Sequence, residues 1–376
     1  MSLSSVAAAE LAADARRFDT VIDVRSPAEF AEDHLPGALN WPVLDDEQRR
    51  VVGRLYKQVS ALEARKVGAA MVARNIASHL ERWVHDKPRD WQPLVYCWRG
   101  GQRSGSLAWF LGQIGFRSAQ LSGGYKAWRA VVREDLQSLP ARFAFHVLCG
   151  RTGSAKTRLL QVLAEQGAQT LDLEGLARHR GSVLGSVPGE PQPSQKRFDT
   201  LLWEALRGFD PARPVFVEGE SRKIGALRVP EALIQQLREG GRCVRIELSE
   251  SARLQLLLQE YAHFADDVEG FCRLLDGLVV LRGRETVGAW QAMARDGRWP
   301  EVFAALMRQH YDPLYERSMH QSYKQLAATE PLLLHDAEVS TLREAARRLL
   351  AGMRKAQGAR QHSLRAPWHP AALHRQ

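Results

Sequence analysis

The chain of 376 residues is long enough for two ordinary domains, and its 45% hydrophobic and 25% charged residues are typical of a globular protein in water. Its longest apolar runs, such as residues 278–281, are too short to span a bilayer, and no signal-peptide pattern opens the chain. Cys97, Cys149, Cys243 and Cys272 form neither a disulfide framework nor a C-x-x-C metal motif. We therefore expect a cytoplasmic protein with no membrane segment.

The net charge of +9 is concentrated towards the C-terminal end. From Arg343 onward, eight Lys or Arg residues stand against one acid, Glu344, so this part supplies +7 of the +9. One interpretation is a solvated helix face followed by a basic end without regular structure. The other is binding to a polyanion such as RNA, and charge alone leaves both open.

Residues 1–137 alternate strand and helix signals at short spacing. Residues 18–25 (FDTVIDVR) and 93–97 (PLVYC) are typical of buried strands, and the first is followed by a short helix that begins at Ser26. A helix is predicted from Ser104, followed by a short strand, a Gly-Gly turn and a last helix. Strands that alternate with helices predict a parallel α/β sheet.

A second α/β pattern follows a predicted linker at residues 137–142. Strands are predicted at residues 143–150, 168–173, 214–220, 243–248 and 331–336. Residues 250–326 predict mostly helix, and residues 339–353 predict an amphipathic helix with Thr341 and Glu344 at capping-box spacing near its start. We therefore expect three regions, which are a first domain of residues 1–137, a second of residues 143–356, and a basic tail of residues 357–376 without regular structure.

Cys97 ends a predicted buried strand and precedes a helix, which is where open α/β sheets bind ligands. Two glycines let the next residues curl and aim backbone N–H groups inward, and two arginines add positive charge. The helix from Ser104 points its positive end at the same place, so we expect the thiol pKa to lie below its usual value of about 8.5. The predicted loop comprises Trp98, Arg99, Gly100, Gly101, Gln102, Arg103 and Ser104.

The loop residues favour a reactive cysteine over a packing one, because a buried packing site needs neither glycines nor arginines. The C-x5-R spacing from Cys97 to Arg103 is also that of cysteine-dependent phosphatases, although Tyr96 stands where they usually have histidine. The residues alone leave a phosphatase nucleophile and a carrier of sulfur or selenium open.

Residues 22–42 (IDVRSPAEFAEDHLPGALNWP), together with YCWRGGQRS and residues 121–129 (LSGGYKAWR), closely resemble a rhodanese-like domain. The resemblance implies that Asp23 and Arg25 are mainly structural and that Cys97 carries a persulfide or perselenide. The loop is one residue longer than in many single-domain rhodaneses and nearer to that of phosphatases sharing the fold. Thiosulfate is therefore not required as the donor.

Residues 149–160 (CGRTGSAKTRLL) follow a predicted strand and open a helix, which is the context of a phosphate-binding P-loop, G-x-x-x-x-G-K-[ST]. Lys156 and Thr157 match the motif, but Ala155 replaces its second glycine and makes binding of ATP less certain. Backbone N–H groups still suit a diphosphate, with Lys156 on its oxygens and Thr157 on Mg²⁺. The predicted diphosphate-binding residues are Gly150, Thr152, Gly153, Ser154, Ala155, Lys156 and Thr157.

Further polar residues follow the predicted strands of the second domain. Carboxylates at strand ends suit a metal ion or its water, and basic residues neutralise phosphate. Each alone is equally well a solvated loop residue, and His179 is equally well structural, but as a set around one P-loop they predict a site. The set is Asp172, Glu174, Arg178, His179, Arg180, Glu218, Glu220, Arg222 and Lys223.

The combination of YCWRGGQRSG, GRTGSAKT, LDLEGLARHRGS, QPSQKRF, ESRKIG and HYDPLYE resembles the bacterial tRNA 2-selenouridine synthase family over about residues 18–350. The resemblance implies a rhodanese-like parallel-sheet domain followed by a P-loop NTPase-like α/β domain with a helical C-terminal part. It implies exchange of sulfur for selenium in wobble 2-thiouridine of tRNA, through an S-geranyl-2-thiouridine intermediate. Selenophosphate and geranyl diphosphate are the implied co-substrates, with no tightly bound cofactor and with Mg²⁺ allowed beside the diphosphate.

Other functions fit the residues as well. One is a cysteine-dependent phosphatase or a thiosulfate sulfurtransferase fused to a P-loop kinase-like domain. Another is a non-catalytic RNA-binding module, but the intact Cys97 loop argues against it. Within the family function, Cys97 is either a perselenide carrier or a nucleophile that assists departure of the thiol. The sequence locates no pocket for the geranyl chain and predicts no oligomeric state.

Overall fold

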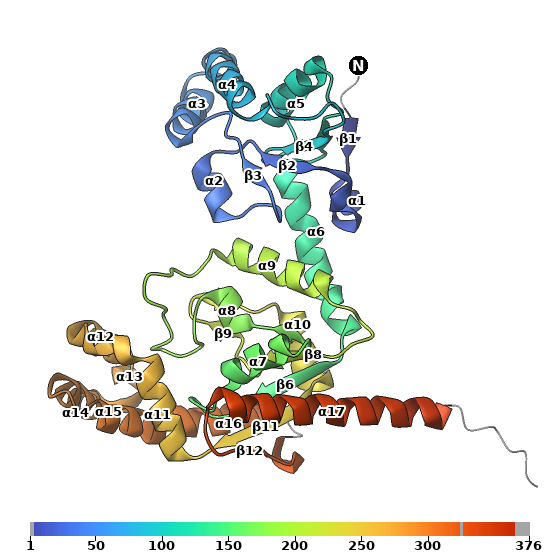
Figure 1. The fold of residues 1–376 in the computed structure, drawn as a ribbon. Coiled ribbons are helices and arrows are strands. Elements are labelled where there is room, and N and C mark those ends of the chain that lie inside the picture. The colour runs from blue at the N-terminus through green and yellow to red at the C-terminus, as the bar shows by residue number, and fades with distance from the viewer. Residues whose placement is uncertain (1–3, 324–325, 365–376) are drawn as a thin grey trace, which may run out of the picture.

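The computed structural model of the chain describes residues 4–323 and 326–364, without the side chains of residues 320, 327 and 354–364. Two five-stranded parallel sheets organise it, and α9 (Gln195–Gly208) lies between them in Figure 1. Both sheets carry helices on their faces, so the predicted fold class is confirmed.

The first sheet has the strand order β1-β5-β4-β2-β3. Its strands are β1 (Ser4–Val6), β2 (Thr20–Asp23), β3 (Leu39–Asn40), β4 (Pro93–Tyr96) and β5 (Ala119–Leu121). The helices of this part are α1 (Ala8–Ala13), α2 (Pro27–Glu32), α3 (Asp46–Gln58), α4 (Ala61–Trp83), α5 (Gln102–Ile114) and α6 (Gly124–Ser138). The strands predicted at residues 18–25 and 93–97 are thereby confirmed.

The central strand β4 is buried on both faces because helices cover both. Leu94 and Tyr96 pack in an apolar cluster with residues of α6, whereas Val95 and Cys97 pack on the opposite face with residues of α5. A strand covered on both sides is a continuous apolar run, as residues 93–97 are.

Residues 46–83 form a hairpin of two helices, α3 and α4, which the sequence analysis did not predict. Asp45 caps α3 by accepting the Gln48 N–H at 2.8 Å, and Ser60 caps α4 by accepting the Glu63 N–H at 3.1 Å. Such caps satisfy N–H groups that the first turn of a helix leaves without partners. The hairpin fills the long connection between β3 and β4.

The segment predicted as a linker is folded. Helix α6 is followed directly by a 3₁₀ helix, Leu139–Arg142, in which Leu139 and Pro140 are buried. The apolar cluster around Leu139 continues into the second sheet, so burial of these side chains orders the connection.

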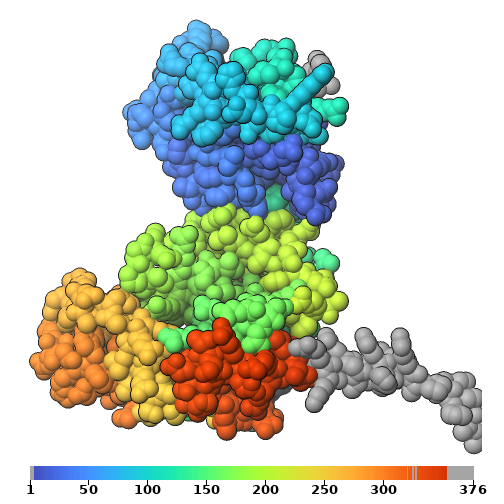
Figure 2. All heavy atoms as spheres, in the orientation of Figure 1, coloured from blue at the N-terminus to red at the C-terminus, as the bar shows by residue number. Residues whose placement is uncertain are grey.

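Helix α9 packs against α6 where the first sheet meets the second part of the chain (Figure 1). The rings of Trp128 and Trp203 meet edge to face with centroids 4.8 Å apart, and Arg129 pairs with Asp199 at 2.8 Å. The space-filling view shows the blue N-terminal residues resting on the yellow-green residues of α9 (Figure 2).

The second sheet has the order β12-β11-β6-β8-β7, and a small antiparallel ribbon accompanies it. The strands are β6 (Phe145–Cys149), β7 (Gln169–Leu171), β8 (Val215–Glu218), β11 (Arg242–Leu248) and β12 (Leu332–Leu334), with β9 (Lys223–Ile224) and β10 (Leu227–Arg228) in the ribbon. Helices α7 (Lys156–Glu165), α8 (Leu173–Ala177) and α10 (Glu231–Gln235) join α9 in this part. All five strands predicted for this domain are confirmed.

The region 250–326 is mostly helical, as predicted. Its helices are α11 (Glu250–Glu260), α12 (Val268–Asp276), α13 (Val279–Arg282), α14 (Arg284–Arg295), α15 (Trp299–Leu306) and α16 (Asp312–Ser322). No helix in the described part of the chain has the length and apolar character needed to cross a membrane.

The last helix, α17 (Val339–Leu364), is longer than predicted and continues past residue 357, where the tail was expected to begin. Residues 365–376 of that tail lie outside the described residues. The predicted capping box is wrong, because Thr341 lies inside the helix and its hydroxyl contacts His335 Nε2 at 3.0 Å.

Candidate functional site

Cys97 directly follows β4, and its side chain is only 3% exposed under the loop that leads into α5. Its Sγ accepts hydrogen bonds from the Gly101 N–H at 3.3 Å and from the Ser104 hydroxyl at 3.2 Å. Burial opposes ionisation, but the Ser104 hydrogen bond, the charge of Arg103 and backbone hydrogen bonds outweigh it, so the pKa of the Cys97 thiol is lowered. This is the direction that the sequence predicted.

Glycines allow the Cys97 loop and the start of α6 to touch. Gly100 has a φ of +63°, and a Cβ there would lie 2.5 Å from the Leu121 carbonyl oxygen. The Tyr125 N–H donates to the Cys97 carbonyl at 2.8 Å, and the Lys126 N–H donates to the Trp98 carbonyl at 3.0 Å. The two quoted motifs, YCWRGGQRS and LSGGYKAWR, therefore lie against each other and are joined by backbone hydrogen bonds.

The two arginines of the loop differ in their surroundings. Arg103 donates to a Glu29 carboxylate oxygen at 2.8 Å. Burial alone would raise the pKa of Glu29, but this hydrogen bond and the arginine charge outweigh burial, so the pKa is lowered. Arg99 is exposed and has no ion-pair partner within residues 4–323 and 326–364. Arg103 is thus held in place, whereas Arg99 is available to an incoming anion.

Asp23 and Arg25 lie fully buried close to the Cys97 strand. The Arg25 guanidinium donates to both Asp23 carboxylate oxygens and to the Asp33 carbonyl at 2.6 Å, and it lies 3.9 Å from the Tyr125 ring centroid. The pair links β2, α2 and α6, which is the structural role that the resemblance implied.

The P-loop lies between β6 and α7, the context that the motif requires. Ala155 adopts a left-handed conformation with φ +63°, which normally favours glycine, and its side chain is only 5% exposed against an apolar cluster with Leu159. The Lys156 ammonium donates to the Gly150 carbonyl at 2.8 Å. The lysine thus bonds back to its own loop.

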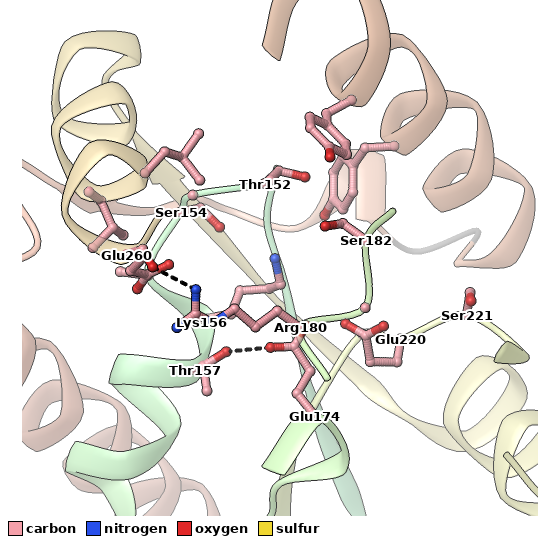
Figure 3. A pocket seen from close by; sticks show the side chains of 18 of the residues that line it. Thr152, Ser154, Lys156, Thr157, Glu174, Arg180, Ser182, Glu220, Ser221 and Glu260 are labelled. Atoms are coloured by element: carbon pink, nitrogen blue, oxygen red, sulfur yellow. Dashed lines mark hydrogen bonds between the residues drawn. The ribbon is translucent and has the colours of Figure 1, made fainter. Parts of the chain in front are cut away.

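A cavity of about 580 Å³ lies in front of the P-loop (Figure 3). All six residues from Thr152 to Thr157 line it, whereas Gly150 borders a neighbouring cavity of about 430 Å³. The Thr157 hydroxyl donates to a Glu174 carboxylate oxygen at 3.1 Å, as the dashed line in Figure 3 shows.

Glu174 and Glu220 meet in this cavity around Gly181. A Cβ at Gly181 would lie 2.8 Å from a Glu220 oxygen and 3.0 Å from a Glu174 oxygen. Burial and the Glu220 charge raise the pKa of Glu174 to about 8, and burial raises the pKa of Glu220 although Lys156 opposes it. The cluster of buried carboxylates therefore favours a nearby cation.

The oxygen atoms that line this cavity suit a Mg²⁺ ion that also binds a diphosphate. Within the described residues, no group of three or more His, Cys, Asp or Glu side chains suits a metal ion. The Thr157 hydroxyl and the Glu174 and Glu220 carboxylates are oxygen donors, which Mg²⁺ prefers, and Mg²⁺ commonly completes its shell with phosphate oxygens and water.

Arg180 is the basic residue of the predicted set that lines the cavity. Its guanidinium donates to the Glu260 carbonyl at 2.7 Å and lies 5.0 Å from the Tyr261 ring centroid. Arg180, Glu174 and Glu220 come from different segments and surround the same space in Figure 3.

The two other predicted carboxylates support the fold beside the cavity. Asp172 caps α8 by accepting the Gly175 N–H at 2.6 Å. Glu218 is fully buried and accepts the Leu173 N–H at 3.1 Å, while burial and the Asp172 charge raise its pKa well above the usual range.

The remaining basic residues of the set do not line the cavity. Arg178 ends α8 in a left-handed conformation, and His179 is half-buried, with burial lowering its pKa. Arg222 pairs with Glu231 at 3.0 Å on the surface, and Lys223 is exposed in β9.

The apolar wall of the cavity was not predicted from the sequence. Helices α11 and α16 and the turn before α16 supply it, through Leu256, Leu257, Tyr261, Tyr311, Leu314, Tyr315 and Met319. Tyr311 and Tyr315 belong to the quoted HYDPLYE stretch, and their spacing of four residues places them on one helix face. That spacing was the available signal.

Comparisons with known proteins match both domains of the chain. A rhodanese-like domain model matches residues 7–131, and a model described as the tRNA 2-selenouridine synthase AAA domain matches residues 143–273. The tRNA 2-selenouridine synthase of Alcanivorax borkumensis is 34% identical over 328 residues, covering 79% of this chain and 88% of that protein. Those of Hydrogenovibrio crunogenus and Cupriavidus necator are 33% and 32% identical, covering 80% and 85% of this chain and 89% and 95% of those proteins.

Proposed function

The chain belongs to the tRNA 2-selenouridine synthase family, and we propose that it exchanges the sulfur of wobble 2-thiouridine in tRNA for selenium. The observation that carries this proposal is that one chain holds both a loop that lowers the pKa of a cysteine thiol and a P-loop cavity with an apolar wall. We propose selenophosphate as the selenium donor and geranyl diphosphate as the alkyl donor. A cytoplasmic location is supported by the four cysteines, all of which are free.

In the proposed first step, the diphosphate lies on the P-loop and the geranyl chain lies along the tyrosines and leucines of the cavity. Lys156 turns from the Gly150 carbonyl to the diphosphate oxygens and, with Arg180, neutralises them. The thiouridine sulfur attacks C1 of the geranyl group, so an S–C bond forms and the C–O bond breaks. Diphosphate leaves with the electron pair, and the base loses the proton from N3 to water.

Magnesium, held by Thr157 with Glu174 and Glu220, would add positive charge beside the leaving diphosphate. The apolar wall supports a prenyl diphosphate over a nucleotide, because a geranyl chain is entirely hydrocarbon. Burial of that chain against Leu257, Tyr315 and Met319 contributes binding that a bare diphosphate lacks.

In the proposed second step, the Cys97 thiolate attacks the phosphorus of selenophosphate. The S–P bond forms, the Se–P bond breaks, and hydrogen selenide leaves with the electron pair and attacks C2 of the alkylated base, where it displaces geranyl thiol. Water then attacks the phosphorus of the S-phosphocysteine, so the S–P bond breaks, phosphate leaves and the Cys97 thiolate is restored. A perselenide on Cys97 would require an added oxidant, because the selenium of selenophosphate is already fully reduced. Arg99 of this loop is exposed and has no ion-pair partner among the described residues, which supports binding of the phosphate oxygens there.

A two-stage assay with the full chain tests this function. An anticodon stem–loop RNA that contains 2-thiouridine is incubated with geranyl diphosphate and Mg²⁺, and then with selenophosphate. We expect S-geranyl-2-thiouridine in the first stage and 2-selenouridine in the second, by mass spectrometry of the nucleosides. Unchanged RNA, together with Cys97-dependent hydrolysis of an aryl phosphate, would instead indicate a phosphatase.

A further inference from the structure

A groove of about 1020 Å³ crosses the N-terminal domain and has no role in the two proposed steps. It runs between the α3–α4 hairpin and α5. Small residues lie along it, including Ala61, Ala64, Gly68 and Gly105, and their short side chains leave the space between the helices unfilled. The groove is therefore a feature of the helix packing rather than of one flexible loop.

Aromatic rings border this groove and are open to solvent. Tyr56 of α3 is 64% exposed and Trp109 of α5 is 53% exposed, although both line the same cavity. Large aromatic side chains left in water lose the stabilisation of burial, so an exposed pair beside a groove indicates a contact surface.

The hairpin carries a strong excess of positive charge. Residues 46–83 contain eight Lys or Arg residues against four Asp or Glu residues. Arg65 lines the groove, and its guanidinium Nε donates to the Ala61 carbonyl at 3.1 Å, but it has no carboxylate partner in the described part of the chain. Arg49 lines the groove as well and lies 3.7 Å from a Glu29 oxygen.

The groove leads directly to the reactive cysteine. Gln102 and Arg103, the first residues of α5, line the groove and belong to the Cys97 loop. The next residue, Ser104, donates its hydroxyl to Cys97 Sγ at 3.2 Å. A molecule lying along the groove therefore ends beside the Cys97 loop.

We propose that this groove binds single-stranded RNA, namely the anticodon-loop nucleotides next to the one that is modified. Their bases stack on Trp109 and Tyr56, and their phosphates contact Arg65 and Arg49. Unpaired RNA bases are characteristically recognised by stacking on aromatic side chains, with basic residues along the backbone. This assignment rests on the proposed function, because it takes the tRNA as the substrate.

Charge and exposure favour RNA over the other occupants of such a groove. A second copy of the chain would bring the same positive hairpin against this one, and the two would repel. A prenyl chain would gain most from an enclosed apolar pocket, whereas both rings here are more than half exposed.

Binding of a labelled anticodon stem–loop RNA to the full chain, measured by fluorescence anisotropy at several salt concentrations, tests the assignment. Trp109→Ala should weaken binding by about five- to hundredfold, the range expected for loss of one stacked base. Trp109→Phe should restore most of the affinity. Arg65→Glu should weaken binding and lower the slope of log K against log salt by about 1 or more.

Two matched controls lie in the same domain outside the groove. Trp83 is 46% exposed at the end of α4, and Arg89 is exposed in the following loop. Trp83→Ala and Arg89→Glu should bind the RNA as the wild type does. Circular dichroism and thermal melting of every variant separate a lost contact from a lost fold.

The other outcomes overturn the assignment in distinguishable ways. If the wild type binds and modifies the RNA but Trp109→Ala and Arg65→Glu bind equally well, the groove assignment is wrong and the proposed function stands. If the wild type binds no RNA, both are wrong. If Trp109→Ala instead converts a dimer to a monomer in sedimentation, or weakens geranyl diphosphate binding in calorimetry with RNA affinity unchanged, the groove serves that other occupant.

Discussion

The Cys97 loop and the P-loop differ in how far the protein itself satisfies their polar groups. Cys97 Sγ has two hydrogen-bond donors, and Arg103 beside it is paired with Glu29. At the P-loop, by contrast, Lys156 bonds to a carbonyl of its own loop, and Glu174 has a pKa of about 8. At the first site the sulfur of the nucleophile is fully hydrogen-bonded without a ligand, whereas the polar groups of the second are arranged so that a ligand completes their bonding.

This difference suits the two proposed reactions. A nucleophile is most useful when its ionised form is favoured and its position is fixed, and the hydrogen bonds to Cys97 Sγ act in both directions. A site for a charged co-substrate gains binding energy when the ligand and its cation relieve carboxylates that repel one another.

Removal of the Thr157 hydroxyl tests whether the P-loop cavity is arranged for a diphosphate and its cation. Thr157→Val keeps the shape of the side chain but removes the group that contacts Glu174, and should slow geranyl transfer by about 100-fold or more. Thr157→Ser keeps the hydroxyl and should remain near the wild-type rate. The measurement is single-turnover alkylation of thiouridine RNA, and a fast Thr157→Val variant would show that the hydroxyl has no role there.

Removal of the Arg103 charge tests how the Cys97 loop lowers the pKa of its thiol. Arg103→Gln removes one of the causes that lower the Cys97 pKa, so the thiolate fraction near neutral pH should fall. Alkylation of Cys97 by iodoacetamide at pH 7, followed by mass spectrometry, should slow by about tenfold per unit of pKa. Arg89→Gln serves as the control, and an unchanged alkylation rate in Arg103→Gln would contradict the electrostatic account.

The pH dependence of stability tests the buried carboxylates. The pKa of Glu174 is about 8 in the folded chain and 4.5 in the unfolded chain. Between pH 4.5 and pH 8, the folded chain therefore holds a proton that the unfolded chain has lost. Stability from this group is present below pH 4.5 and is lost as the pH rises through about 8. Glu174→Gln avoids this loss, so its melting temperature relative to wild type should rise by a few degrees between pH 5 and pH 8.5.

Glu204→Gln, an exposed change in α9, provides the control for that series. A difference between Glu174→Gln and wild type that stays constant from pH 5 to pH 8.5 would show that this carboxylate is not strained by its surroundings. The contrast between the two sites would then lose its electrostatic basis.

The smallest effect is expected at the residue that departs from the P-loop motif. The left-handed conformation costs alanine about 1–2 kcal/mol. Ala155→Gly removes this cost but also raises the conformational entropy of the unfolded chain, so the free energy of unfolding should change by about 1 kcal/mol or less. Because the Ala155 methyl packs against the core, diphosphate affinity by calorimetry should stay within about twofold of wild type. A tenfold gain would show that the methyl obstructs the phosphate.

Local patterns predicted what local residues determine. The run at residues 93–97 and the loop before Lys156 carry their own signals, so the strands, the Cys97 position and the P-loop context were predictable. The sequence did not predict which strand-end carboxylate faces the cavity. Glu174 lines the cavity, whereas Glu218 is buried beside it. That choice depends on how α8 packs, which no local pattern encodes.

The apolar wall and the groove escaped prediction for the same reason. Arg253 of α11 joins the P-loop to α16, because it donates to the Thr152 carbonyl at 2.9 Å and to both carboxylate oxygens of Asp312. This contact joins residues far apart in the sequence and brings two helices over the P-loop. The groove likewise depends on how the hairpin packs beside α5.

The most direct test of the division of labour is nucleoside analysis of tRNA from cells that lack this protein and receive wild type, Cys97→Ala or Lys156→Ala. We predict no selenouridine with Cys97→Ala but accumulation of the S-geranyl nucleoside, and neither nucleoside with Lys156→Ala. Normal selenouridine with Cys97→Ala, or S-geranyl nucleoside at wild-type levels with Lys156→Ala, would contradict the assignment of alkylation to the P-loop and selenium transfer to the Cys97 loop.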